Sequence, residues 1–149
     1  MVDKMTITEI KNSNIQTHAQ LLVDTFTEEP WLEDWTIDIA HNRLLCYQNT
    51  SNFIGLSCLK NNELIAFIFG NIEPYQNSSH FLLKEMCVKK EFQGEGIGKK
   101  LIAKLHGKLK QEKVDSVILL TQKESLAEKF YMSSGYELAD SMGLYFKKL

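Results

Sequence analysis

The sequence predicts an α/β fold with one mixed sheet, its elements following the order βααβββαβαββ. Segments typical of strands are interspersed with segments that repeat apolar residues at helical spacing. The chain has 149 residues, 44% of them hydrophobic and 24% charged, which fits a single domain over residues 1–149. A glycine-rich turn at residues 93–98 joins one strand directly to one helix.

The N-terminal third predicts a strand followed by two helices. Residues 5–10 alternate in type and contain threonine and isoleucine, as strands do. Asn14 or Thr17 is placed to cap a first helix, whose pattern ends at Pro30. Thr36 is placed to cap a second helix that extends to about residue 48. The apolar sides of the two helices comprise Leu21, Leu22, Val23, Phe26, Ile37, Ala40, Leu44 and Leu45.

Three strands are expected in the middle of the chain. Asn61-Asn62 predicts a tight hairpin turn, because asparagine tolerates the left-handed conformation that such turns need. The apolar run after this turn indicates a central strand, which extends towards Tyr75, although Pro74 limits pairing there. The expected segments are strands at residues 53–60, 64–70 and 81–88, and a polar loop at residues 76–79.

The C-terminal part predicts two helices and three further strands. The helix after the glycine-rich turn repeats apolar residues at 97, 101, 102, 105 and 109. A later helix is supported by pairs four residues apart, and Gly135 is a suitable residue to end it. The expected segments are helices at residues 97–109 and 125–133, and strands at residues 116–121, 136–139 and 144–147.

The turn Gln93-Gly94-Glu95-Gly96-Ile97-Gly98 is the strongest candidate for a binding site. Glycines let a ligand approach the backbone, and the free N–H groups at the start of a helix favour a phosphate. The spacing differs from the dinucleotide fingerprint, and the Lys99-Lys100 that follows rules out a P-loop. On the glycines alone, an ordinary turn leading into a helix remains the alternative.

Composition excludes several classes of function. The net charge of −2 provides no basic field for nucleic acid. No apolar run is long enough to span a membrane, and the N-terminus lacks the hydrophobic region of a signal peptide, so we expect a cytoplasmic protein. The cysteines, which show no ligand spacing, are expected to be reduced: Cys46, Cys58 and Cys87. No metal site is expected, because no pair of the histidines is suitably spaced: His18, His41, His80 and His106.

The glycine-rich turn resembles the acyl-CoA-binding motif of the GNAT N-acetyltransferase superfamily. That motif is Arg or Gln, two variable residues, Gly, one variable residue, then Gly or Ala, which Gln93, Gly96 and Gly98 match. In the family it follows a strand that ends in a valine, as Val88 does here.

A second family motif is matched downstream. Family members often carry Asn, Ala, Tyr, Gly and Phe at positions where this chain has Glu124, Ala127, Tyr131, Gly135 and Tyr136. Glu124 departs from the pattern, which puts a cofactor contact at that position in doubt. The resemblance covers nearly the whole chain, and the N-terminal region looks similar to bacterial aminoglycoside 6′-acetyltransferase-like members.

The resemblance implies a mostly antiparallel sheet with helices on both faces, in which the fourth and fifth strands are parallel and splay apart. It also implies acetyl-CoA as cofactor. Backbone amides of the turn would hold the pyrophosphate, and the splayed strand would pair with the pantetheine arm; Lys99 and Lys100 would add charge unless they only form a solvated face. The implied contacts are Met86, Cys87, Val88, Gln93, Gly94, Glu95, Gly96, Ile97, Gly98 and Lys99.

Two residues are candidates for catalysis of acetyl transfer to an amine. The resemblance implies that Tyr131 protonates the leaving thiolate; the alternative is a core aromatic paired with Ala127. Glu85 lies in an apolar strand, where a raised pKa would suit a general base acting directly or through water. The alternatives for Glu85 are a surface salt bridge, or a water chain as the base. Cys87 is a poor candidate nucleophile, since no histidine is near it in sequence.

In the family, the loop between the first two helices borders the acceptor groove. Here it combines acids with both tryptophans, which suits a cationic acceptor: a polyamine, an aminoglycoside-like amine or a lysine-bearing peptide. The alternative is that the tryptophans anchor the loop and the acids are solvated. The candidate acceptor-binding residues are Glu28, Glu29, Trp31, Trp35 and Tyr75, with Glu33 and Asp34 beside them.

The resemblance favours an acetyl-CoA-dependent N-acetyltransferase. A non-catalytic acyl-CoA-binding or sensing module is the alternative, and a purely structural domain is a third. Retention of Tyr131 and Glu85 favours the enzyme. A homodimer formed through the last strands is a further expectation from the resemblance.

Overall fold

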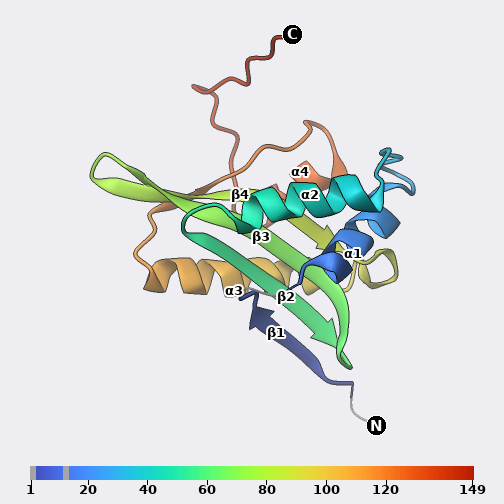
Figure 1. The fold of residues 1–149 in the computed structure, drawn as a ribbon. Helices are drawn as coiled ribbons and strands as arrows, with labels where there is room; N and C mark the ends of the chain where they lie inside the picture. The colour runs from blue at the N-terminus through green and yellow to red at the C-terminus, as the bar shows by residue number, and fades with distance from the viewer. Residues whose placement is uncertain (1–2, 12–13) are drawn as a thin grey trace.

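Over residues 3–11 and 14–149, which the computed structural model describes, five strands form one open sheet in the order β1-β2-β3-β4-β5 (Figure 1). Neighbouring strands are antiparallel except β4 and β5, which are parallel. The predicted fold class, a mixed and mostly antiparallel sheet, is therefore confirmed. The strands are β1 (Met5–Glu9), β2 (Phe53–Lys60), β3 (Glu63–Tyr75), β4 (Ser78–Val88) and β5 (Ser116–Ile118).

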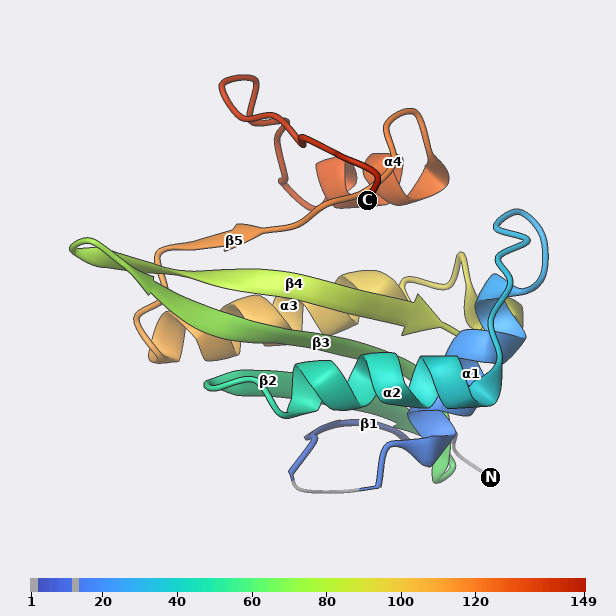
Figure 2. The same cartoon turned by 45° about the horizontal axis from the view of Figure 1, so that its top comes forward.

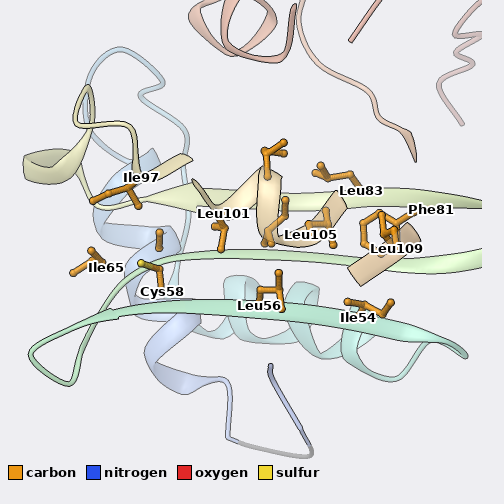
Figure 3. Close-up of a cluster of buried hydrophobic side chains, with 13 residues drawn as sticks. Ile54, Leu56, Cys58, Ile65, Phe81, Leu83, Ile97, Leu101, Leu105 and Leu109 are labelled. Carbon is orange, nitrogen blue, oxygen red and sulfur yellow. The ribbon is translucent and has the colours of Figure 1, made fainter. Parts of the chain in front are cut away.

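Helices cover both faces of the sheet (Figure 2). Helices α1 and α2 lie on one face, where their apolar residues pack with Phe67, Phe69 and Cys87. Helix α3 lies on the other face and buries a second cluster against β2, β3 and β4 (Figure 3). The helices are α1 (Gln16–Phe26), α2 (Ile37–Gln48), α3 (Ile97–Gln111) and α4 (Leu126–Ser133), with a short 3₁₀ turn at Lys90–Phe92.

Local signals set the ends of these helices. The hydroxyl of Thr36 accepts a hydrogen bond from the backbone N–H of Ile39, which caps α2 as expected. The carboxamide oxygen of Asn14 accepts from the backbone N–H of Gln16 at 2.8 Å, so Asn14 rather than Thr17 supports the start of α1. Ser125 caps α4 in the same way as Thr36 caps α2.

A β-bulge in β4 determines which side chains reach each face of the sheet. Gly70 on β3 pairs with Leu83, and the preceding Phe69 pairs with Glu85, so Lys84 is an extra residue in β4. Leu83 therefore lies in the core beside α3, whereas Glu85 and Cys87 point towards α1 and α2. With regular alternation, Leu83, Glu85 and Cys87 would share one face.

The structure differs from the prediction at the C-terminal end. Residues 136–149 contain neither of the two predicted strands, 136–139 and 144–147, because this segment lies away from the sheet, where no strand edge offers hydrogen bonds (Figures 1 and 2). Strand β5 is also shorter than predicted and ends at Ile118, which is exposed rather than buried. The expected polar loop at 76–79 contracts to a two-residue turn, because β3 and β4 extend into it.

Candidate functional site

One edge of β4 is open next to the glycine-rich turn. Its parallel pairing with β5 involves only His80–Leu82, and no further pairing with β5 occurs among the described residues. The backbone N–H of Lys89 donates to Ile65 on β3, so by strand alternation the polar groups of Met86 and Val88 point to the open edge. The Val88 carbonyl accepts a hydrogen bond from the side chain of Gln93 at 2.9 Å. The open edge therefore still offers both polar groups of Met86 and the N–H of Val88.

The three glycines of the turn serve two different purposes. Gly94 and Gly96 have φ angles of 79° and 81°, and a Cβ built on either would meet no atom within 4 Å. They therefore leave an unfilled space at the start of α3. A Cβ at Gly98 would lie 3.0 Å from the ring of Phe130 and 3.3 Å from the Cε of Met86. Gly98 thus lets α4 and β4 pack against α3.

The N-terminus of α3 is suited to an anion. Unlike α2 and α4, it has no side-chain cap, and no acidic residue lies in its first turn. Lys99 and Lys100 are exposed there, as is Glu95 in the preceding turn. The uncapped amides and the space beside Gly94 and Gly96 fit the pyrophosphate that the sequence predicts.

Glu85 combines features of the two sequence-based alternatives. Its side chain is only 14% exposed, and the Nε of Arg43 on α2 donates to its carboxylate at 3.0 Å. Burial raises the pKa of Glu85, while the hydrogen bond and charge of Arg43 oppose that rise. Glu85 therefore forms an ion pair, as the salt-bridge alternative expects. It is also buried, as a base with a raised pKa requires.

Tyr131 reaches β4 from α4. Its hydroxyl donates a long hydrogen bond of 3.8 Å to the sulfur of Met86, on the strand that presents the open edge. Burial raises the pKa of Tyr131, and the nearby Tyr136 and Glu85 raise it further. The phenol is therefore protonated at neutral pH, as a proton donor must be.

Cys87 is not suited to nucleophilic chemistry. Burial raises the pKa of its thiol to about 12, and its sulfur lies 3.7 Å from the carbonyl oxygen of Leu21, on the face covered by α1. A buried neutral thiol agrees with its role in the core.

Several charged and aromatic side chains of the loop between α1 and α2 already contact other residues of the chain. Glu28 forms an ion pair with Lys90 at 3.0 Å, and the indole N–H of Trp35 donates to Glu33. Trp31 packs edge-on against Phe26, with ring centroids 5.1 Å apart. Glu29 and Asp34 are exposed. This arrangement favours the anchoring alternative for the two tryptophans.

Arg43 is a site residue that the sequence analysis missed. Its guanidinium lies 5.6 Å from the ring centroid of Trp35 and 5.2 Å from that of Tyr47, beside Glu85. In the sequence pattern of the second helix, Arg43 looks like an ordinary polar surface residue. The signal was present nonetheless, because it is the only arginine among the 17 basic residues of the chain.

The structure does not bring Tyr75 to this site. Tyr75 lies at the hairpin between β3 and β4, at the opposite end of the sheet from the α1–α2 loop, and its ring packs on His80 (Figure 2). We therefore leave it out of the site proposed below. A hollow of about 330 Å³ near the C-terminal end of α3, lined by Glu9 and Lys108 among others, is also separate from it.

Within the described residues, no group of three or more His, Cys, Asp or Glu side chains is placed to hold a metal ion. None of the helices in this part of the chain has the length and apolar character that crossing a membrane requires.

Comparisons with known proteins agree with this geometry. A family model described as an acetyltransferase (GNAT) domain matches residues 51–138. Comparison with curated proteins gives no match.

Solved structures share the fold at low sequence identity. A possible acetyltransferase from Clostridium difficile 630 has a TM-score of 0.81 and 17% identity, with 97% of each chain covered. Aminoglycoside N-acetyltransferase AAC(6')-Iy in complex with CoA has a TM-score of 0.76 and 17% identity, covering 100% of this chain and 98% of that one. An aminoglycoside acetyltransferase from an uncultured soil metagenomic sample, in complex with sisomicin, has a TM-score of 0.72 and 18% identity, covering 97% and 96%.

Proposed function

The chain belongs to the GNAT acetyltransferase family, and on this premise we propose that it transfers the acetyl group of acetyl-CoA to a primary amine. The observation that carries the proposal is the open edge of β4 beside an uncapped, glycine-lined helix N-terminus. Together these supply backbone donors for an extended arm and for a pyrophosphate.

The turn and the strand have separate roles in binding. The amides from Gln93 to Gly98 hold the pyrophosphate, and Lys99 adds positive charge beside it. The carbonyl of Met86 and the N–H of Val88 pair with the pantetheine arm as a neighbouring strand would. Acetyl-CoA, when bound, supplies a thioester carbonyl that accepts the amine and a thiolate that leaves.

Three groups of the chain then move or stabilise charge. Glu85 accepts the proton of the acceptor ammonium, directly or through a water, so that the neutral nitrogen forms the new C–N bond. The N–H of Met86 stabilises the oxyanion. As the C–S bond breaks, Tyr131 gives its phenolic proton to the sulfur. The proton that the nitrogen loses as the amide forms, passed through water, restores the phenol.

The acceptor is proposed to be a small-molecule or peptide amine. Two of the solved structures with this fold are named as aminoglycoside acetyltransferases, which supports a small-molecule acceptor. The exposed Glu29 and Asp34 of the loop are available to attract a cationic amine.

A non-catalytic acyl-CoA-binding module is the second candidate. The observation that favours it is the pairing of Glu85 with Arg43, which holds the proposed base in an ion pair. Such a module would bind acetyl-CoA without consuming it.

The test is thiol release from acetyl-CoA across a panel of amines, with wild type and Tyr131→Phe. We expect turnover with at least one amine class, and a kcat reduced by about 100-fold or more in the variant, because a general acid is lost. Tyr75→Phe, at an exposed position in the hairpin between β3 and β4, is the matched control and should retain full activity.

Calorimetric titration with CoA shows whether an absence of turnover comes from an absence of CoA binding. Binding without turnover would favour the binding module, and absence of binding would contradict the role given to the glycine-rich turn. If Tyr131→Phe leaves turnover unchanged, only the role of Tyr131 is contradicted, and the acetyltransferase function stands.

A further inference from the structure

We propose that Arg43 forms an anion-binding subsite beside Glu85, and that this subsite selects acceptor amines that carry a carboxylate. The proposal rests on the acetyl-transfer function above and narrows its acceptor to the amino-acid class.

Trp35, one of the aromatic residues expected to receive a cationic acceptor, already contacts a cation of the chain. The guanidinium of Arg43 lies over the rings of Trp35 and Tyr47, with distances to their centroids of 5.6 Å and 5.2 Å. An external ammonium would have to displace it. The face that remains for a ligand is therefore the guanidinium itself.

Arg43 retains unused donors. A guanidinium has five N–H groups, and among the described residues only Nε finds an acceptor, Glu85 at 3.0 Å. No hydrogen bond joins its terminal nitrogens to any residue in the described part of the chain. The side chain is 43% exposed, which leaves part of it open to a ligand.

The surroundings hold the guanidinium in a fixed plane. Two aromatic rings and a buried carboxylate constrain it, which lowers the entropy lost when a ligand binds. A planar pair of terminal N–H groups matches the two oxygens of a carboxylate. Lysine cannot reproduce this geometry, and the chain uses lysine at all its other basic positions.

The two neighbouring charges, Arg43 and Glu85, are complementary to the carboxylate and the ammonium group of a zwitterion. The guanidinium of Arg43, whose side chain is 43% exposed, pairs with the carboxylate of Glu85, the proposed acceptor of the ammonium proton, whose side chain is 14% exposed. A molecule with an amine and a carboxylate a few bonds apart can place its carboxylate on Arg43 and its amine beside Glu85. Free amino acids have this arrangement, whereas polyamines lack the anionic group.

The experiment compares acceptors that differ only in the carboxylate: lysine with cadaverine, ornithine with putrescine, and phenylalanine with phenethylamine. Thiol release from acetyl-CoA is measured for wild type, Arg43→Gln, Arg43→Lys and Lys110→Gln. The last variant removes one exposed positive charge from the far end of α3 and serves as the matched control.

We expect wild type to prefer the amino acid of each pair. Arg43→Gln should lower kcat/KM for the amino acids, mainly through KM, by roughly 10- to 100-fold more than it lowers kcat/KM for the simple amines, because only the amino acids lose a partner for their carboxylate. Arg43→Lys should recover part of the preference, and Lys110→Gln should match wild type.

Two results would overturn the proposal. One is a wild-type preference for the simple amines. The other is an equal loss for both members of each pair in Arg43→Gln, which would mean that Arg43 acts only by holding Glu85.

A binding measurement decides the question if no amine is acetylated at all, a result that counts against the enzymatic function. The CoA-loaded protein is titrated with N-acetylphenylalanine and with N-acetylphenethylamine. Tighter binding of the carboxylate compound, lost in Arg43→Gln, would support the subsite independently of turnover. Equal binding of the two compounds would refute it.

Discussion

Burial favours the neutral forms of Glu85, Tyr131 and His18, so it raises the pKa of the two acids and lowers the pKa of the histidine. For the two acids it favours the neutral form, so Tyr131 keeps its proton and Glu85 holds one to a higher pH than an exposed glutamate. For His18 burial also favours the neutral form, which lowers the pKa to about 4. The same physical cause thus keeps the proposed donor protonated, raises the pKa of the proposed base and makes the stability of the core depend on pH through His18.

The pH dependence of activity tests the role of Glu85. The base works only as a carboxylate, so activity falls as pH decreases through its pKa. Because that pKa is raised, the loss should begin above the ordinary range of glutamate near 4.5. In Glu85→Gln we expect kcat to fall by about 100-fold and this limb of the kcat profile to disappear. A profile unchanged in the variant would show that a water chain, rather than Glu85, is the base.

The stability of the protein should depend on pH through His18. Its Nε2 lies 2.8 Å from the Ser57 hydroxyl, and its ring packs against Phe67 and Phe69. The unfolded chain binds a proton near the ordinary pKa of 6.5, whereas the folded state does so only near 4. The free energy of unfolding should therefore decrease as pH falls between these values, by about 3 kcal/mol in total.

Urea unfolding at pH 7 and pH 5 measures this effect. His18→Asn should be less stable at pH 7, yet lose less stability than wild type between the two conditions. Equal losses in both proteins would assign the pH dependence to other groups.

Among the secondary-structure elements, the start of α3 is where the glycine-rich turn meets α4, the helix that carries Tyr131. A Cβ at Gly98 would lie 3.0 Å from the ring of Phe130, so that ring, next to Tyr131 on α4, would have to shift by a few tenths of an ångström. The turn proposed to bind the pyrophosphate and the helix that carries the proposed proton donor are thus packed together at one glycine.

Gly98→Ala should lower kcat by about 10-fold or more and change CoA affinity by only a few-fold, because it shifts the ring next to Tyr131 rather than the free amides. Gly107→Ala is the matched control on the same helix: a Cβ there meets no atom within 4 Å, so both values should stay at wild-type level. Steady-state kinetics and calorimetry measure the two quantities. A loss of CoA affinity as large as the loss of kcat would contradict the packing role of Gly98.

Local patterns were sufficient to predict most elements of this fold. Apolar spacing predicted α1, α2 and α3, and Asn61-Asn62 predicted the hairpin between β2 and β3, where both residues have positive φ. The bulge at Lys84 was not predictable, because an extra residue becomes visible only in the register with β3. The pair of Arg43 and Glu85 was missed for a similar reason: 42 positions separate them in sequence.

The predicted C-terminal strands failed for a different physical reason. A pattern shows that a segment can form a strand, but a strand also needs an edge to pair with. No part of residues 136–149 lies along such an edge. The sequence pattern indicates that these residues can form strands, but it does not show whether a neighbouring strand is there to pair with them.

For the molecule as a whole, the outstanding feature is apolar surface beyond β5. Strand β5 ends the sheet, and the segment after α4 lies apart from the rest (Figure 2). So many exposed apolar side chains in one segment are typical of an interface. The exposed side chains are Leu120, Leu126, Met132, Leu138, Met142, Leu144, Tyr145 and Phe146.

We propose that this surface joins two copies of the chain. Sedimentation analysis should give a dimer for wild type and a monomer for the double variant Leu144→Lys, Phe146→Lys, because two buried charges would oppose association. Tyr75→Ser, which alters an exposed aromatic at the other end of the sheet, should remain dimeric. A wild-type protein that is monomeric at micromolar concentration would refute this assembly.

Helix α4 carries the proposed acid, yet none of its residues is fully buried. It is held largely by Phe130 and Tyr131, which pack against the core beside α3. Elements with so little buried surface open and close more readily than the sheet beneath them. Protonation of the leaving group is possible only in the fraction of molecules whose α4 is docked, so that population multiplies the rate of the chemical step. The turnover number then reflects an equilibrium of packing as much as the reactivity of a phenol.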